Sequence, residues 1–150
     1  MWKVDREWIP YHEALSLVLS RVQEVDCEEV DVLNCVGRFL CRDLTSMADA
    51  PPFNRAAMDG YAVRAEDTFG ASSENPRVLE VIGESDIGNP FFGQIREGEA
   101  VYVHTGSAIP EGADAVIPVE YTKSENNKIY IYKSVAVGEN ISKRGEDISK

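Results

Sequence analysis

Apolar residues in the first part of the chain recur at helical spacing, with polar side chains on the other faces. The apolar positions are Tyr11, Leu15, Val18, Leu19 and Val22. Because positions three and four apart lie on one face of a helix, this spacing predicts an amphipathic helix that begins at Pro10 and ends at the acidic segment 24–29.

Two further elements are predicted before residue 46. The run V-D-V-L from Val30 alternates apolar and polar residues as a strand does. Asn34 can then cap a short second helix with the sequence C-V-G-R-F-L-C-R, which runs toward Asp43.

Beyond Ser46 the helical period disappears, and short β-rich runs alternate with Gly, Pro and Asn turns. These runs cover residues 61–64, 77–82, 100–104, 115–119, 128–132 and 134–137. The spacing predicts a compact sandwich or barrel of mostly antiparallel strands. The expected fold class is mainly β (α+β), with an N-terminal amphipathic helix, a short second helix and a β domain of about six to seven short strands. The predicted domains are a helical and strand segment at 1–45, the β domain at 46–140, and a return segment at 141–150.

Composition indicates a folded, soluble protein. The chain has 150 residues, 43% of them hydrophobic and 27% charged, which suits one globular domain or one domain with a small appendage. No apolar run reaches the ~18 residues of a membrane span, and the start M-W-K-V-D-R-E-W does not resemble a signal peptide. We therefore expect a cytoplasmic protein.

The three cysteines, Cys27, Cys35 and Cys41, match no zinc or redox spacing. We expect them to be buried small side chains that stay reduced.

The net charge of −11 is uneven: residues 1 to 120 carry a balance of −13 and the last thirty carry +2. Nonspecific nucleic-acid binding needs a clustered Lys/Arg face, so the acidic body argues against a nucleic-acid partner.

The first candidate motif is P-P-F-N-R-A-A-M-D-G-Y-A-V-R, residues 51–64. Met58-Asp59-Gly60 places a carboxylate beside a glycine that can adopt a positive φ. By itself, Asp-Gly is typical of a hairpin turn.

The second motif spans residues 98–120, where an apolar strand runs into H-T-G-S. An aspartic protease needs an acid at the position of His104, so that class is excluded. Thr105 and Gly106 can present a hydroxyl and an unpaired backbone N–H to an anion such as phosphate, or can simply end the strand. His104 and His12 are expected to be ordinary surface or packing histidines.

The third motif, residues 140–150, reads N-I-S-K-R-G-E-D-I-S-K. Without context it is a solvated polar turn. As a site, Arg144 can bind a phosphate while Asp147 holds a hard cation through oxygen.

The three motifs, their order and the earlier segment N-C-V-G-R-F-L together resemble the MoeA family over nearly the whole chain. The resemblance implies an enzyme that takes adenylylated molybdopterin and molybdate, releases AMP and leaves molybdenum on the pterin dithiolene, with Mg²⁺ assisting. Gephyrin contains the equivalent domain.

The resemblance also assigns catalytic roles to three residues, Asp59, Thr105 and Asp147. From their chemistry, we expect Asp59 and Asp147 to position the metal, and Lys143, Arg144 and Gly106 to bind the cofactor substrate. The family's site faces a cleft completed by the other protomer, which implies a homodimer in the complete enzyme and possible contact with the molybdopterin adenylyltransferase, with no nucleic-acid or membrane partner.

Some residues depart from the family pattern. Ala56 stands where family members often have Ser, and the Arg-rich run before G-E-D is reduced to Ser142-Lys143-Arg144. The chain ends at Lys150, before the family's pterin-binding domain. We expect an N-terminal fragment that is inactive alone.

Two alternatives remain open. One is a non-catalytic dimerisation or scaffolding module of the same fold. The other is an unrelated small β-barrel that binds an anionic metabolite.

Overall fold

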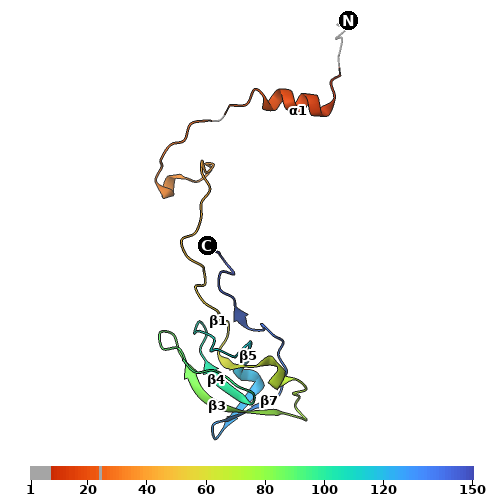
Figure 1. Ribbon diagram of the computed structural model, residues 1–150, viewed down its shortest axis with the longest axis vertical. Helices are drawn as coiled ribbons and strands as arrows, with labels where there is room; N and C mark the ends of the chain where they lie inside the picture. The colour runs from red at the N-terminus through yellow and green to blue at the C-terminus, as the bar shows by residue number, and fades with distance from the viewer. Residues whose placement is uncertain (1–7, 24) are drawn as a thin grey trace. The chain divides into compact units, whose positions relative to one another are not determined.

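The computed structural model describes residues 8–23 and 25–150 and separates into two compact units, Met1–Leu44 and Thr45–Lys150 (Figure 1). The predicted three-part division into 1–45, 46–140 and 141–150 stays a prediction.

The first unit contains one α-helix, α1, at Tyr11–Leu19. It begins after Pro10, whose carbonyl accepts hydrogen bonds from the N–H groups of Glu13 and Ala14. Proline suits this place because its fixed φ matches the first turn and its missing N–H would have no partner there. Val22, the last apolar residue of the predicted pattern, lies beyond the end of the helix.

The predicted strand from Val30 and the predicted second helix at 35–42 are both wrong. Val32–Asn34 form a short 3₁₀ helix, η1, which the carboxylate of Asp31 caps by accepting from the N–H of Leu33. Residues 35–42 form turns and irregular backbone. Gly37 lies in the middle of this segment with a φ of 80°, a left-handed conformation that a right-handed helix cannot contain.

The prediction for the cysteines is also wrong. Cys27 and Cys41 form a disulfide, and Cys35 is exposed. Both partners lie in irregular backbone, and the bond closes a loop around η1. Sequence spacing does not reveal such a pairing because it depends on how the loop folds back on itself.

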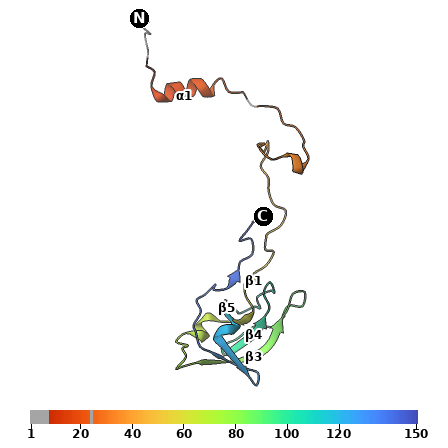
Figure 2. The same ribbon diagram turned by 180° about the vertical axis from the view of Figure 1, so that it is seen from behind.

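The second unit is built on a six-stranded sheet with the order β5-β2-β4-β3-β7-β6. Its strands are β2 (Gly60–Val63), β3 (Arg77–Ser85), β4 (Glu99–Val103), β5 (Ala115–Pro118), β6 (Thr122–Glu125) and β7 (Lys128–Ile131). Figure 2 labels three of these strands, β3, β4 and β5. Neighbouring strands are antiparallel except β3 and β4, which are parallel. Two further 3₁₀ helices, η2 (Ala65–Thr68) and η3 (Val119–Tyr121), follow β2 and β5.

A separate two-stranded ribbon joins β1 (Arg55–Ala56) to β8 (Ile141–Ser142). This ribbon brings the first and third motifs together, although about ninety residues separate them in the sequence.

Both faces of the central strands are buried, so the sheet must curl to cover itself. Along β2, Val63 belongs to one apolar cluster and Ala62 to a second. Along β5, Ile117 belongs to the first cluster and Val116 to the second. Because successive side chains of a strand point to opposite faces, the two clusters lie on opposite sides of the sheet. The mainly β fold class with an N-terminal helix is confirmed.

Five of the six predicted strand runs contain an observed strand, and the run 134–137 does not. Val135 is nevertheless buried, and its N–H donates to the hydroxyl of Thr68 instead of to a neighbouring strand. Strand β6 was not predicted because T-K-S-E has no apolar alternation. It forms because Asn126 and Asn127 both take positive φ, which suits the tight hairpin that pairs β6 with β7.

Candidate functional site

Asp59 and Thr105 form the centre of the candidate site. Oδ1 of Asp59 accepts hydrogen bonds from the N–H of Thr105 at 2.7 Å and from its hydroxyl at 2.8 Å. Asp59 immediately precedes β2 and Thr105 closely follows β4. These strands are antiparallel, with Gly60 opposite Val103, so the end of β4 meets the start of β2. The sheet register therefore brings together two residues that are 46 positions apart.

Gly60 allows Asp59 to occupy this place, but not in the predicted way. Its φ is not positive, and it is the first residue of β2, so the hairpin turn that Asp-Gly indicates by itself is not formed here. A Cβ at Gly60 would lie 2.2 Å from the carbonyl oxygen of Ile117 on β5. Glycine is needed here because two backbones approach too closely for any side chain.

The turn at Thr105 and Gly106 has no unpaired backbone N–H of the kind predicted to bind an anion. Gly106 has a φ of 88°, and its N–H donates to the carbonyl of Ala56 at 2.8 Å. The N–H of Thr105 is taken by Asp59. A ligand at this turn would instead meet the lone pairs of the Thr105 hydroxyl and the carboxylate of Asp59.

The hydrogen bonds from Thr105 make Asp59 a stable anion. The backbone N–H and then the hydroxyl of Thr105 hold the pKa of the Asp59 carboxyl below its ordinary value. Among the residues that the structure describes, no donor contacts Oδ2 of Asp59. The site thus offers a negatively charged oxygen whose orientation is set by the other oxygen.

His104 lies next to Thr105 and acts as a packing histidine, as expected. Its Nε2 is 2.7 Å from Oε1 of Glu84, and its ring meets the edge of Tyr102 at 5.0 Å between centroids and 88° between planes. The hydrogen bond with Glu84 raises the pKa of His104 above its ordinary value. His12, on α1, is exposed.

This pair predicts a measurable pH dependence. A histidine whose pKa is higher in the folded than in the unfolded protein stabilises the fold most below about pH 6.5, its unfolded pKa. That stabilisation is lost as the pH rises through the raised pKa of His104. We expect Glu84→Gln to return the pKa of the His104 ring, measured by NMR titration, toward its ordinary value. Glu80→Gln, at an exposed position on the same strand, is the control; equal pKa values in both variants would refute the assigned cause.

The third motif folds onto the start of the first motif and the residue before it. The N–H of Asp147 donates to the carbonyl of Ala50 at 2.9 Å, and the N–H of Gly145 donates to the carbonyl of Pro51 at 2.9 Å. The side chain of Asp147 is exposed. Within the described parts of the chain, no hydrogen bond or ion pair joins Asp147 to Asp59 or Thr105.

The two predicted phosphate ligands differ in their surroundings. Arg144 donates from Nε to Oδ2 of Asp49 at 2.6 Å, so part of its guanidinium is already paired. Lys143 is exposed, and only its backbone is held: its N–H donates to the carboxylate of Glu146 at 3.0 Å and its carbonyl accepts from the N–H of Glu146 at 3.1 Å. Sequence patterns did not identify Asp49 because it lies outside the three motifs.

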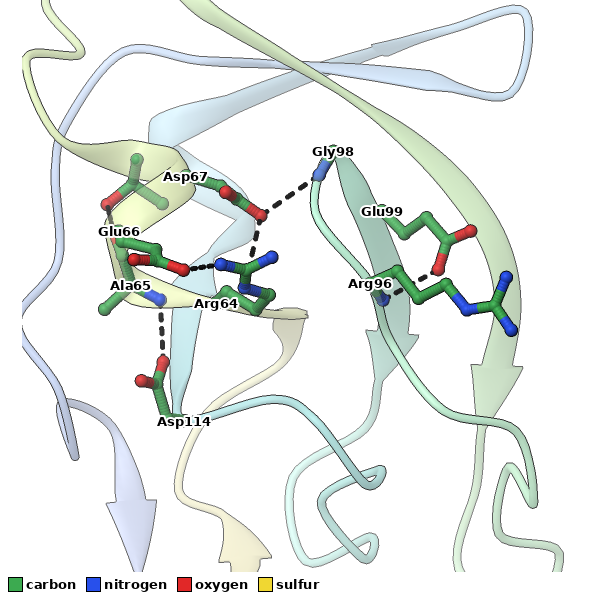
Figure 3. A network of polar contacts seen from close by, with 9 residues as sticks. Arg64, Ala65, Glu66, Asp67, Arg96, Gly98, Glu99 and Asp114 are labelled. Atoms are coloured by element: carbon green, nitrogen blue, oxygen red, sulfur yellow. Dashed lines mark hydrogen bonds and ion pairs between the residues drawn. The ribbon is translucent and has the colours of Figure 1, made fainter.

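A polar network holds the other end of β2 (Figure 3). Arg64, the last residue of the first motif, pairs with Glu66 and lies 4.0 Å from Asp67. Asp67 also accepts from the N–H of Gly98 at 3.1 Å. The network therefore ties the segment after β2 to the turn before β4. It lies at the opposite end of β2 from Asp59, and its role is to hold the strands in register.

The described residues, 8–23 and 25–150, contain no group of three or more His, Cys, Asp or Glu side chains placed to hold a metal ion. Asp59 offers one exposed oxygen. Mg²⁺ is commonly held by one or two carboxylates together with water and substrate phosphates, so a single carboxylate fits a shared metal site and not a closed one. In the same part of the chain, no helix has the length and apolar character needed to cross a membrane.

Comparison with known proteins identifies the family of the chain. Residues 9–150 match the family described as the MoeA N-terminal region (domain I and II). The chain is 40% identical to the molybdopterin molybdenumtransferase of Bacillus subtilis over 95% of this chain and 34% of that protein. It is 38% identical to the molybdopterin molybdenumtransferase of a Nostoc species over 83% of this chain and 28% of that protein.

A solved structure leads to the same family. The crystal structure of the molybdopterin biosynthesis protein MoeA from Pyrococcus horikoshii matches with a TM-score of 0.83 and 48% identity, over 96% of this chain and 38% of that one. The chain spans about a third of the length of the curated relatives that it matches. Because the family match covers almost all of its residues, the chain belongs to the MoeA family and carries that family's N-terminal region.

Proposed function

We propose that this chain is the N-terminal part of a molybdopterin molybdenumtransferase, which inserts molybdate into adenylylated molybdopterin and releases AMP. The observation that carries the proposal is the pairing of Asp59 with Thr105. It presents a charged carboxylate oxygen where the start of β2 meets the end of β4. The names of the relatives supply the reaction class.

In this proposal Asp59 orients a water molecule or a metal-bound phosphate. Thr105 saturates Oδ1 and leaves Oδ2 to face the substrate. A Mg²⁺ ion held by Asp59 and Asp147 would neutralise charge on the substrate phosphates when bound. Thr105 keeps the carboxylate ionised and stops it from rotating.

The negative charge of the chain implies that additional cations are needed to bind the substrate. The substrate is anionic and the chain carries −11, so the two repel unless cations intervene. Within the third motif, Lys143 and Arg144 are the candidate cations for binding the substrate phosphates. We propose that the remaining cations come from the rest of the enzyme, across a homodimer interface, and that the 150-residue chain alone does not insert molybdenum.

Contact with the molybdopterin adenylyltransferase and a location in the cytoplasm are parts of the same proposal. The Cys27–Cys41 disulfide bears on the proposed location in the cytoplasm. Reducing compartments keep most cysteine pairs as thiols, except in hyperthermophiles. Mapping the disulfide in protein isolated from cells tests the proposed location.

Asp59→Asn in the full-length enzyme tests the proposed role. The amide keeps the size of the side chain but loses the charge, so we expect molybdenum insertion to fall about 10²-fold, as when an outer ligand or an orienting group is removed. The measurement is AMP release from adenylylated molybdopterin together with molybdenum content. Dimer mass by light scattering is expected to stay unchanged.

The matched control is Asp86→Asn; among the residues described, the Asp86 carboxylate accepts a hydrogen bond only from the N–H of its neighbour Ile87. The two variants should differ strongly in activity. If Asp59→Asn is as active as this control, the site role is wrong, and the scaffolding alternative becomes the better explanation of the fold.

A further inference from the structure

Two short segments from opposite ends of the second unit pair side by side. Residues 49–54 contain the start of the first motif and the two residues before it, and residues 144–150 contain the G-E-D turn. Ala50 and Ile148 form an antiparallel bridge, with N···O distances of 2.8 and 3.1 Å. In Figures 1 and 2 the last residues run alongside the chain that enters β1.

The Asp49 side chain holds both ends of the G-E-D turn. Its Oδ2 accepts from Nε of Arg144 at 2.6 Å, and its Oδ1 accepts from the N–H of Lys150 at 2.8 Å. Although the turn is exposed, the Asp49 side chain is only 16% exposed. Asn54 adds a third side-chain bond, from the N–H of Arg144 to its Oδ1 at 2.9 Å.

Asp147 lies between the two points that Asp49 holds. The only bond of Asp147 to this segment is the one from its N–H to the carbonyl of Ala50, and its own carboxylate is exposed. The direction of that carboxylate therefore depends on the backbone of the turn. Exposed backbone hydrogen bonds near the end of a segment open easily, so side-chain anchors at Arg144 and Lys150 decide how rigid the turn is.

We infer that Asp49 is a positioning residue, which fixes the G-E-D turn so that Asp147 and Arg144 face the substrate in one arrangement. This inference rests on the proposed function, because it assigns Asp49 to the same site. Nothing in the three motifs assigns it this role.

The chemistry requires a carboxylate at this position. Both partners are donors, an N–H of Arg144 and an N–H of Lys150, so two acceptor oxygens are needed. Asparagine has one acceptor oxygen and a donor NH₂ group, so it can satisfy only one partner. The ionised state is favoured as well, since the Lys150 N–H and then Arg144 hold the pKa of Asp49 below its ordinary value.

The first test is Asp49→Asn in the 150-residue chain, read by NMR amide exchange. Loss of one charge-assisted hydrogen bond is worth a factor of about ten in local opening. We expect the amides of Asp147, Ile148 and Lys150 to exchange about tenfold faster, while amides in β4 and β7 keep their rates. Glu74→Gln is the control, because Glu74 is exposed and makes no side-chain hydrogen bond among the described residues. Unchanged exchange in the turn would overturn the inference.

The second test separates positioning from substrate binding in the full-length enzyme. Substituting Asp49 removes the anion that competes with phosphate for Arg144, so we expect kcat to fall about tenfold while KM for adenylylated molybdopterin does not rise. A rise in KM with unchanged kcat would overturn the inference. Wild-type protein without insertion activity would overturn the proposed function instead, and the exchange experiment would still decide whether Asp49 holds the turn.

Discussion

Gly60→Ala is expected to destabilise the second unit by about 3 kcal/mol or more, at the upper end of the range for overpacked sites. The new Cβ would lie 2.2 Å from the carbonyl oxygen of Ile117 and 3.0 Å from its carbonyl carbon. These are backbone atoms of β5, which pairs with β2 along its whole length and cannot move aside as a flexible side chain does. Urea unfolding, followed by circular dichroism, measures the change.

The control for this prediction is Gly88→Ala. Gly88 has a φ of 81°, but a Cβ there would meet nothing within 4 Å, so only backbone strain of about 1 kcal/mol is expected. Because the φ of Gly60 is not positive, Gly60→Ala carries no such backbone strain, so the difference between the two variants is a lower bound on the cost of the close approach. Equal midpoints of unfolding would mean that β2 and β5 can separate at Gly60, and the account of Asp59's placement would then be wrong.

Ile129→Ala is expected to cost about 2–5 kcal/mol, the range for removing a large aliphatic side chain from a core. Ile129 is fully buried on β7, opposite Leu79 of β3, within the first apolar cluster. The substitution loses transfer free energy and leaves a cavity between strands that are both fixed by pairing. The unfolding midpoint should fall with no change in the slope of the transition.

Two controls define this effect. Ile129→Val removes one methylene group and should cost about 0.5–1.5 kcal/mol. Val78→Ala, on the neighbouring strand, changes a residue that is 46% exposed and should cost less than about 1 kcal/mol. An Ile129→Ala variant no less stable than Val78→Ala would mean that β7 does not cover the core as described.

The candidate site was predictable only as a set of residues, not as an arrangement. The motif sequences identified Asp59, Thr105 and Asp147 as candidates, and the structure pairs the first two directly. The predicted anion-binding N–H at Gly106 was wrong because the carbonyl of Ala56 already accepts from it. That contact joins β1 to the turn after β4, and no local pattern specifies which distant carbonyl reaches a given N–H.

The partner of a charged side chain is equally hard to predict from local sequence. Arg144 has the chemistry of a phosphate ligand, yet its Nε is bound to Asp49, which lies 95 residues earlier. Sequence distance hides this pairing, because the two segments meet only in the folded unit, through the ribbon of β1 and β8 and the Ala50–Ile148 bridge. The Cys27–Cys41 disulfide was missed for a similar reason, since cysteine spacing does not report where the side chains meet.

Local patterns were sufficient for the helix α1 and for five strands of the sheet, and the resemblance of the three motifs was sufficient for the family of the chain. Helical and alternating periodicity express which side chains face a core, and that information is contained in neighbouring residues. Tertiary structure decided the strand order, the two-sided burial of the sheet, and the need for glycine at position 60. It also decided that Asp59 meets Thr105 and that Asp49 meets Arg144, because such contacts arise from pairing between strands that lie far apart in the sequence.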